Sequence, residues 1–599
     1  MYEIIFMKLA KRQFFFALLI AVLFVFSMVD TKEFVYSSLS YSLFVTIGSS
    51  VITFIVLCCM AKIGLSSKKN VCIKDFKGSC LWYPSLFIIY IYWHHLVFGC
   101  EMYRLFYLMS TILLCITVSL CLSYKFVSWR IIENITVFMV LYHIVFIILH
   151  LLGILDNSPI HNMITGVDDI PTVSAIFLSS SSFIFISKIE RYRRKMKIFY
   201  LSLLILVLFS LLLLKCRSAI IGFFSTIIIY YFLKYKKSIN CKSIYTYIVI
   251  LILSCVVIVS FLGLYSLKKG SVDGRLLIWK ISSLMILHHP FGMGYGLFEK
   301  NYNIAQSVYF STSKAQFNEM MNADHIYIPY CDLLEMLVDG GWIGGLLFVV
   351  FFVLAIWKSY KKHQYEICAA IISIFIMSLT NFVYTSVQTW CLLMCIFAKA
   401  LSPVVCENKK HRESICYPFL YRSVISIMIV ISYYLFHNVS RLISSQKKLA
   451  HIHLSIKQND FSSAYGLLML EEKIETSELF YTDLGKFYLY QRRLDDALNA
   501  LNMAHKYSSS PELFLLLNRY YIITGNKSMA VDNINILRWM LPHHFYPEMF
   551  LMRTYFAFGD KVNAIKVAND ILIKPVKIKS KKVDYIKNEA KILIKKYEE

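Results

Sequence analysis

Residues 105–123 read LFYLMSTILLCITVSLCLS, a stretch without a single charged side chain. A helix needs about 20 apolar residues to cross the hydrocarbon core of a bilayer, and this stretch has that length. The rest of the chain has the same character, because 58% of its 599 residues are hydrophobic and only 17% are charged. Soluble domains contain about 45–50% apolar and about 25% charged residues. The composition therefore excludes a soluble enzyme, and its many aromatic residues exclude a disordered chain.

The same length criterion predicts an all-α, polytopic membrane protein with about 13 spans. The predicted spans are residues 13–29, 41–61, 81–99, 105–123, 134–154, 173–187, 198–214, 218–233, 244–266, 343–357, 367–383, 388–401 and 423–437. They define a transmembrane domain over residues 1–437. A large loop over residues 267–342 interrupts it.

The net charge of +25 would suggest a nucleic-acid partner in a soluble protein. In a membrane protein, Lys and Arg instead gather in cytoplasmic loops. Basic residues concentrate in alternate predicted loops, around Lys68, Arg193, Lys236, Lys361 and Lys409. This alternation predicts a cytoplasmic N-terminus and no nucleic-acid partner. It also predicts that the 267–342 loop and everything after residue 437 lie on the opposite, external side.

The segment 438–599 is polar and repeats with a period of 33 or 34 residues. In each unit a tyrosine is followed nine positions later by an alanine, and these pairs are Tyr488 and Ala497, Tyr521 and Ala530, and Tyr555 and Ala564. Gly525 and Gly559 follow their tyrosines by four residues, where one helix would turn into the next, and Arg492 holds the equivalent place. This period resembles tetratricopeptide (TPR) repeats, with a generic helical bundle as the alternative.

No residue pattern predicts a metal or a cofactor. Many of the 16 cysteines lie inside apolar runs, and no pair of cysteines has a zinc-site spacing with histidine. Gly292, Gly294 and Gly296 resemble a phosphate-binding loop only superficially, because no strand precedes them and no Lys-Ser or Lys-Thr follows. We therefore expect neither a nucleotide site nor a cofactor.

The external loop of roughly 75 residues is too long to be a simple connection, so it is where we expect the chemistry. It opens with the motif Arg275-x-x-x-Trp279, continues through Pro290-x-Gly292-x-Gly294, and closes with an acidic, Leu-rich segment that ends Gly341-Trp342-Ile343-Gly344. Outside the loop, Arg217 stands in the sequence Lys215-Cys216-Arg217-Ser218-Ala219 between two apolar runs.

In this order and on one side of the membrane, these motifs resemble the O-antigen ligase and polymerase superfamily of bacterial membrane glycosyltransferases. The resemblance implies a multi-pass protein of the bacterial inner membrane with a periplasmic loop and a periplasmic tail, in lipopolysaccharide or other surface polysaccharide biosynthesis. It implies transfer of a glycan from undecaprenyl (polyprenyl) diphosphate to an acceptor hydroxyl, without a metal. The acceptor would be lipid A core, a protein or another glycan. Some members carry helical repeats.

The resemblance matches Arg217 and Arg275 to two diphosphate-binding arginines. A guanidinium stays charged and binds phosphate oxygens through two parallel hydrogen bonds, so the residue type fits that role. A basic side chain at membrane depth is also costly unless it has a partner, which favours a functional Arg217. The alternatives are an interfacial anchor for Arg217 and a solvated loop charge paired with Asp273 for Arg275.

The catalytic base is left open by the sequence. In the best register the family's histidine falls on Tyr330, while Asp332 and Glu335 match the acidic pattern and His325 lies five residues upstream of Tyr330. A neutral imidazole at His325 could accept the proton of the attacking hydroxyl, and so could a carboxylate at Asp332 or Glu335. Tyr330 could hydrogen-bond the glycan. A purely structural role for the segment is the remaining alternative.

Three functions from different classes are compatible with the sequence. The first is a glycosyltransferase, acting as an O-antigen ligase, a repeat-unit polymerase or a protein O-oligosaccharyltransferase. The second is a transporter of lipid-linked glycans, which should show repeated span patterns and several deeply placed charges. The third is a membrane scaffold whose TPR-like tail recruits a periplasmic protein partner.

Overall fold

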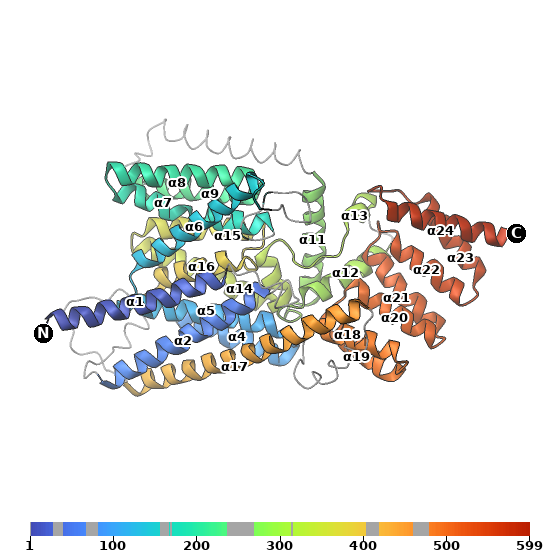
Figure 1. Ribbon diagram of the computed structural model, residues 1–599, viewed down its shortest axis with the longest axis horizontal. Helices are drawn as coiled ribbons and strands as arrows, with labels where there is room; N and C mark the ends of the chain where they lie inside the picture. The colour runs from blue at the N-terminus through green and yellow to red at the C-terminus, as the bar shows by residue number, and fades with distance from the viewer. Residues whose placement is uncertain are drawn as a thin grey trace.

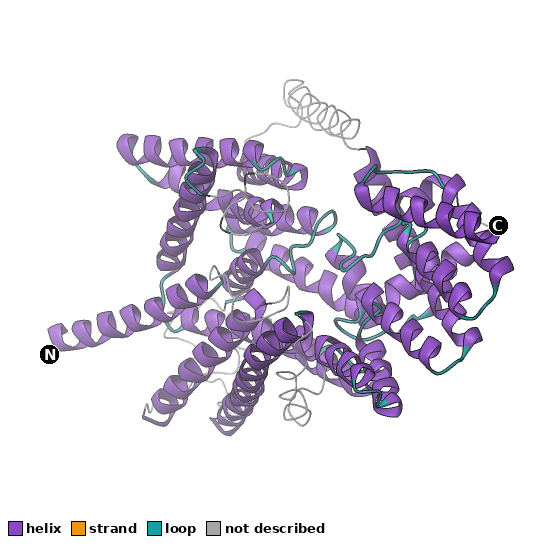
Figure 2. Ribbon diagram, turned by 45° about the vertical axis from the view of Figure 1, so that its right-hand side comes forward, coloured by secondary structure: helices purple, strands orange, loops and turns teal. Residues whose placement is uncertain are grey.

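The computed structural model describes residues 2–27, 40–66, 82–155, 164, 167, 170–235, 269–312, 316–402, 418–458 and 478–598. Within them the chain consists of helices and loops, and the only extended pairing is one isolated bridge between Cys100 and Tyr295. Helices account for nearly all regular structure (Figures 1 and 2). The predicted all-α class is therefore correct for the described chain.

The membrane part contains twelve described helices. They are α1 (Tyr2–Phe26), α2 (Ser40–Ser66), α4 (Trp82–Phe98), α5 (Met102–Ser123), α6 (Trp129–Leu151), α7 (Pro171–Arg191), α8 (Arg194–Leu213), α9 (Arg217–Tyr235), α14 (Asp332–Lys361), α15 (Tyr365–Ser378), α16 (Val387–Leu401) and α17 (Pro418–Lys457). Seven of the described helices are long and apolar enough to cross a membrane. The predicted span 244–266 lies outside the described residues, so the total of 13 spans stays a prediction.

Burial divides the membrane helices into inner and outer ones. Almost all of α5 and α7 is buried, whereas α8 and α9 expose much of their apolar surface. On α8 the exposed side chains include Leu201, Ile205, Phe209 and Leu212, which are 45–60% exposed. Their spacing of three or four residues places them on one side of the helix. An apolar stripe of this kind is typical of contact with lipid.

Three helices of the long loop lie between the membrane helices and the tail. They are α11 (Lys269–His288), α12 (Phe298–Ser311) and α13 (Phe317–Asn322). Figure 1 shows α11 standing across the direction of the membrane helices. The next helix, α14, has its first turns on the loop side and is kinked at Gly341, whose φ is 67°. The loop is therefore a packed layer with its own apolar core around Leu277, Ile281 and Tyr302.

Helix α17 joins the membrane part to the tail. It has 40 residues and would be about 60 Å long, twice the thickness of the hydrocarbon core. Leu435 and Val439 belong to the membrane core, whereas Leu449 and Ile456 belong to the core of the tail. The domain boundary that we placed after residue 437 therefore falls inside a continuous helix.

The tail consists of consecutive helices, each packed on the next. They are α18 (Glu478–Tyr490), α19 (Leu494–Tyr507), α20 (Pro511–Ile523), α21 (Lys527–Met540), α22 (Tyr546–Ala557), α23 (Lys561–Ile573) and α24 (Lys581–Glu598). Arg492, Gly525 and Gly559 lie in the turns between paired helices, and all three have positive φ. The three repeat alanines are fully buried. These positions agree with the expected turns and close contacts, and membership of the TPR family stays a prediction.

Candidate functional site

The turn between α8 and α9 presents Arg217 at the first position of α9. Lys215 makes this reversal possible with a positive φ of 51°. The neighbouring Ser218 is held in place because Asn381 Nδ2 donates a hydrogen bond to its Oγ over 2.7 Å. Arg217 itself is only half-buried. A helix N-terminus favours negative charge, so the position adds to the anion affinity of the guanidinium.

Arg275 reaches the same region from α11. Its Nη1 donates a hydrogen bond to the carbonyl oxygen of Thr380 over 2.7 Å, and its Cζ lies 5.2 Å from the ring centroid of Tyr330. Arg275 forms no ion pair with Asp273 in the part of the chain that the structure describes. The paired loop charge that we considered for Arg275 thus lacks its partner.

The two arginines influence each other electrostatically. Burial lowers the pKa of Arg275, and the positive charge of Arg217 acts in the same direction, while Tyr330 and Cys216 oppose them. No carboxylate among the described residues pairs with either guanidinium. Two neighbouring positive charges without a protein counter-ion form an arrangement that suits a ligand with several negative charges.

A loop that the sequence analysis did not single out, residues 379–386 between α15 and α16, organises this region. Its Thr380 carbonyl binds Arg275 and its Asn381 side chain binds Ser218. Its Phe382 ring packs edge-on against Tyr330 with centroids 5.8 Å apart. The Thr380 contact uses a backbone carbonyl, which any residue type could supply. Residue identities therefore gave little signal of the loop's role.

The first turns of α14 carry three carboxylates on one side. Asp332, Glu335 and Asp339 are spaced by three and four residues, and each is at most 3% exposed. Asp332 Oδ2 accepts a hydrogen bond from the Tyr384 amide over 3.0 Å. Glu335 Oε1 lies 3.9 Å from Arg104 Nη1 on α5. Arg104 was not among our candidates, although a charge beside an apolar span was a usable signal.

Asp339 was also missed, and it connects α14 to the glycine-rich segment. Its Oδ2 accepts a hydrogen bond from the Gly296 amide over 2.8 Å, and its carbonyl oxygen accepts one from Gly294 over 3.0 Å. Gly292, Gly294 and Gly296 all have positive φ. A Cβ on Gly292 would collide with the backbone at Asp339 and Gly341. The glycines thus serve close packing against the kinked helix.

Tyr330 lies beside Arg275. It is half-buried and has a positive φ of 53°, which is unusual for a bulky residue. Its ring is packed between the Arg275 guanidinium and Phe382. Backbone strain of this kind costs of order 1–3 kcal/mol and is concentrated at functional sites.

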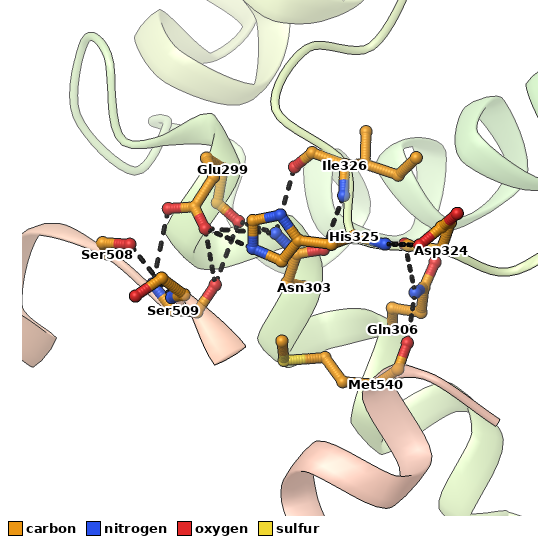
Figure 3. A network of polar contacts seen from close by, with 10 residues as sticks. Glu299, Asn303, Gln306, Asp324, His325, Ile326, Ser508, Ser509 and Met540 are labelled. Carbon is orange, nitrogen blue, oxygen red and sulfur yellow. Dashed lines mark hydrogen bonds and ion pairs between the residues drawn. The ribbon is translucent and has the colours of Figure 1, made fainter. Parts of the chain in front are cut away.

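His325 points in another direction, toward the tail (Figure 3). Its Nε2 lies 2.7 Å from Glu299 Oε1, and its side chain is only 9% exposed. Glu299 also accepts a hydrogen bond from Ser509 Oγ over 3.2 Å. In the described chain, the contacts of His325 run to Glu299, Asp324 and Tyr327, and none reaches Arg217 or Arg275. The structure therefore joins Tyr330 to Arg275, and it joins His325 to Glu299, which contacts the tail.

One known family matches a segment that includes most of this region. Residues 201–349 match the profile of a family described as O-antigen ligase. This segment contains Arg217, Arg275, Tyr330 and the acidic face of α14, but not the 379–386 loop. No curated protein is significantly similar to the chain. The match supports the O-antigen ligase superfamily and a membrane glycosyltransferase-like enzyme of the ligase or polymerase type in polysaccharide biosynthesis.

Proposed function

We propose that this protein transfers a glycan from undecaprenyl diphosphate to an acceptor hydroxyl, as an O-antigen ligase. The observation that carries the proposal is the meeting of Arg217 and Arg275 without a counter-ion in the described chain. A lipid-linked diphosphate brings the negative charge that such a pair lacks. Apolar helices beside the site would accommodate its polyprenyl chain.

In this reaction the acceptor oxygen attacks the anomeric carbon, and the bond from that carbon to the diphosphate oxygen breaks. The electron pair stays on the departing diphosphate, where negative charge increases. Arg217 and Arg275 stabilise that charge through bidentate hydrogen bonds, which are strongest where charge develops. The arrangement of these residues requires no metal for this role.

The acceptor hydroxyl must lose a proton, and we assign this role to Asp332. Its Oδ1 is buried and has no hydrogen-bond partner among the described residues. The 379–386 loop that binds Asp332 Oδ2 also binds Arg275, so the carboxylate and the arginine are positioned together. Glu335 is paired with Arg104 and supports the local charge balance. Tyr330 orients Arg275 and the glycan, and His325 positions the loop.

The test is reconstitution of the purified protein with an undecaprenyl-diphosphate glycan and a panel of acceptors. We expect Arg217→Ala and Arg275→Ala each to reduce transfer about 100-fold, the size of effect found when one charge-stabilising donor is removed. Arg519→Ala, an exposed arginine of α20, is the matched control and should keep full activity. Equal transfer by all three variants would refute the diphosphate role.

The acceptor distinguishes the related enzymes. Transfer to lipid A core identifies a ligase, transfer to protein identifies a protein O-oligosaccharyltransferase, and elongation of the glycan itself identifies a polymerase. No turnover with any acceptor would favour the transporter or the scaffold. A flippase assay in vesicles would then separate these two.

The proposal places the chain in the bacterial inner membrane with a cytoplasmic N-terminus and a periplasmic tail. The alternation of basic loops supports this orientation. Helix α11 and the tail both lie toward one end of the membrane helices in Figure 1, which also fits. Accessibility of the tail to an impermeant protease in spheroplasts tests the orientation, because only a periplasmic tail is cleaved there.

A further inference from the structure

Two histidines of the tail and one aspartate of the loop form a cluster away from the arginine site. His543 and His544 lie in the turn between α21 and α22, and Asp324 lies between α13 and α14. One ring nitrogen of each histidine and one carboxylate oxygen of Asp324 all lie within 4.8 Å of one another. His544 Nε2 is 3.2 Å from Asp324 Oδ1, and the two imidazole centroids are 4.2 Å apart.

The environment of His543 provides a second, independent observation. Its imidazole lies beside the backbone of Ala323. Its Nδ1 is buried and has no hydrogen-bond partner among the described residues. Histidines that bind metals usually donate one ring N–H to a carbonyl or carboxylate and keep the other nitrogen free.

We propose that Asp324, His543 and His544 bind one zinc ion that links the loop to the tail. Two imidazoles and one carboxylate match the donor preference of Zn²⁺, with water as the fourth ligand. Ligand atoms around tetrahedral zinc are about 3.4 Å apart, so the most distant pair must approach by little more than an ångström. Asp324 and His544 are 58% and 33% exposed, which leaves the ion a path from solvent.

Lys577 carries a positive charge near the cluster and acts electrostatically on His543, which disfavours binding of a cation. Its Nζ donates a hydrogen bond to the carbonyl oxygen of Met321, which gives the ammonium a partner outside the cluster. The carboxylate of Asp324 offsets this positive charge. Another hydrogen bond between loop and tail, from Gln306 Nε2 to the Met540 carbonyl oxygen over 2.7 Å, holds the two segments together without metal. The ligands are therefore pre-positioned by a contact that exists independently of zinc.

The test uses the full-length protein, purified with a tag that contains no histidine and stripped with a chelator. Equilibrium dialysis against ZnCl₂ followed by elemental analysis measures bound zinc, and thermal unfolding with and without zinc measures its effect on stability. We expect one zinc per chain and a higher melting temperature with zinc, because an ion that binds only the folded state stabilises it. MgCl₂ should have neither effect.

Two variants and one matched control decide the assignment. The double variant His543→Ala/His544→Ala and the single variant Asp324→Asn should each weaken zinc binding more than about tenfold and abolish the thermal shift. His288→Ala/His289→Ala removes another adjacent pair of histidines, which is exposed on the loop side, and should bind zinc as the wild type does.

Stoichiometric zinc binding that survives both ligand variants would overturn the proposal, and so would the absence of zinc binding by the wild type. If the double variant fails to fold, Asp324→Asn decides, because Asp324 is exposed and its replacement keeps the size of the side chain. The readouts are independent of glycan transfer, so the zinc site stands or falls separately from the proposed function.

Discussion

The arginine site and the junction between loop and tail use charge in opposite ways. At the arginine site, Arg217 and Arg275 lie near each other, and no described carboxylate pairs with either. At the junction, His325 is paired with Glu299, and Glu299 also accepts a hydrogen bond from Ser509. The arginine site leaves its positive charges available to a ligand, whereas the junction pairs its charges within the protein.

The pairing of charges distinguishes a binding site from a structural contact. Desolvated charges are costly, so a folded protein retains unpaired ones only where binding compensates the cost. Charges that are paired within the protein stabilise a particular arrangement of segments. By this criterion His325 belongs with the tail, although its residue type suits catalysis.

The largest effect is expected when both arginines of the site are removed. If both arginines bind one diphosphate, the double variant Arg217→Ala/Arg275→Ala should lose about 1000-fold in transfer, less than the product of the two single losses. Groups that act on one ligand as a unit are not additive. Transfer rates of the two single variants and the double variant, measured side by side, check this. Fully multiplicative losses would mean that the two arginines act on different parts of the substrate.

Next in size is the comparison of Asp332→Asn with His325→Gln. If Asp332 is the base, Asp332→Asn should reduce the rate constant kcat about 100-fold and remove the acidic limb of the pH profile. His325→Gln should reduce the rate less and keep that limb, because it disturbs only the position of the loop. The reverse pattern, with the limb lost in His325→Gln, would make His325 the base.

Packing of the glycine segment should have a smaller but clear effect on stability. Gly292→Ala is expected to destabilise the fold by about 3 kcal/mol, because its Cβ would collide with backbone and its φ is positive. Gly525→Ala has the same kind of φ in open space and should cost about 1 kcal/mol. Denaturant unfolding in detergent measures both. Equal costs would mean that the close approach of the two backbones is not maintained.

Ser509→Ala should weaken the junction by about 1 kcal/mol, since it removes hydrogen bonds to the carbonyl and carboxylate oxygens of Glu299. Ser283→Ala removes an exposed hydroxyl that bonds within its own helix and serves as the control. Proteolytic release of the tail measures the strength of the junction. If the tail is released at a similar rate from both variants, Ser509 does not stabilise the junction.

The smallest expected effect is a pH dependence at the same junction. Burial and the charge of Lys300 lower the pKa of His505, against the opposing influence of the Ser508 backbone and Glu299. The unfolded histidine has a pKa of about 6.5, so the stability that His505 contributes is present above that pH and is lost as the pH falls toward the lower folded pKa. The melting temperature should therefore fall less between pH 7.5 and 5.5 in His505→Gln than in the wild type. If the melting temperature falls equally in both proteins, His505 does not contribute to the pH dependence of stability. Glu478, whose pKa is raised by burial, acts in the opposite direction in both proteins.

Much of the fold followed from local sequence patterns. The length of the apolar runs predicted where membrane helices lie, and every predicted span within the described chain overlaps a helix. The turn glycines of the tail were also anticipated, because a helix reversal favours residues that accept positive φ. The boundary after residue 437 stays a prediction, and α17 continues through it with apolar residues that belong to two cores.

Hydropathy and the cost of a buried charge depend on the residues themselves. The membrane character, the helices and the two candidate arginines could therefore be predicted without a structure. The tertiary structure decided which charges have partners. Arg275 meets Thr380 and Asp332 meets Tyr384 across gaps of 105 and 52 residues, through backbone atoms that every residue type shares. Glu299 similarly meets Ser509 across 210 residues. Pairing depends on distance in space, and no local pattern of residue types encodes it.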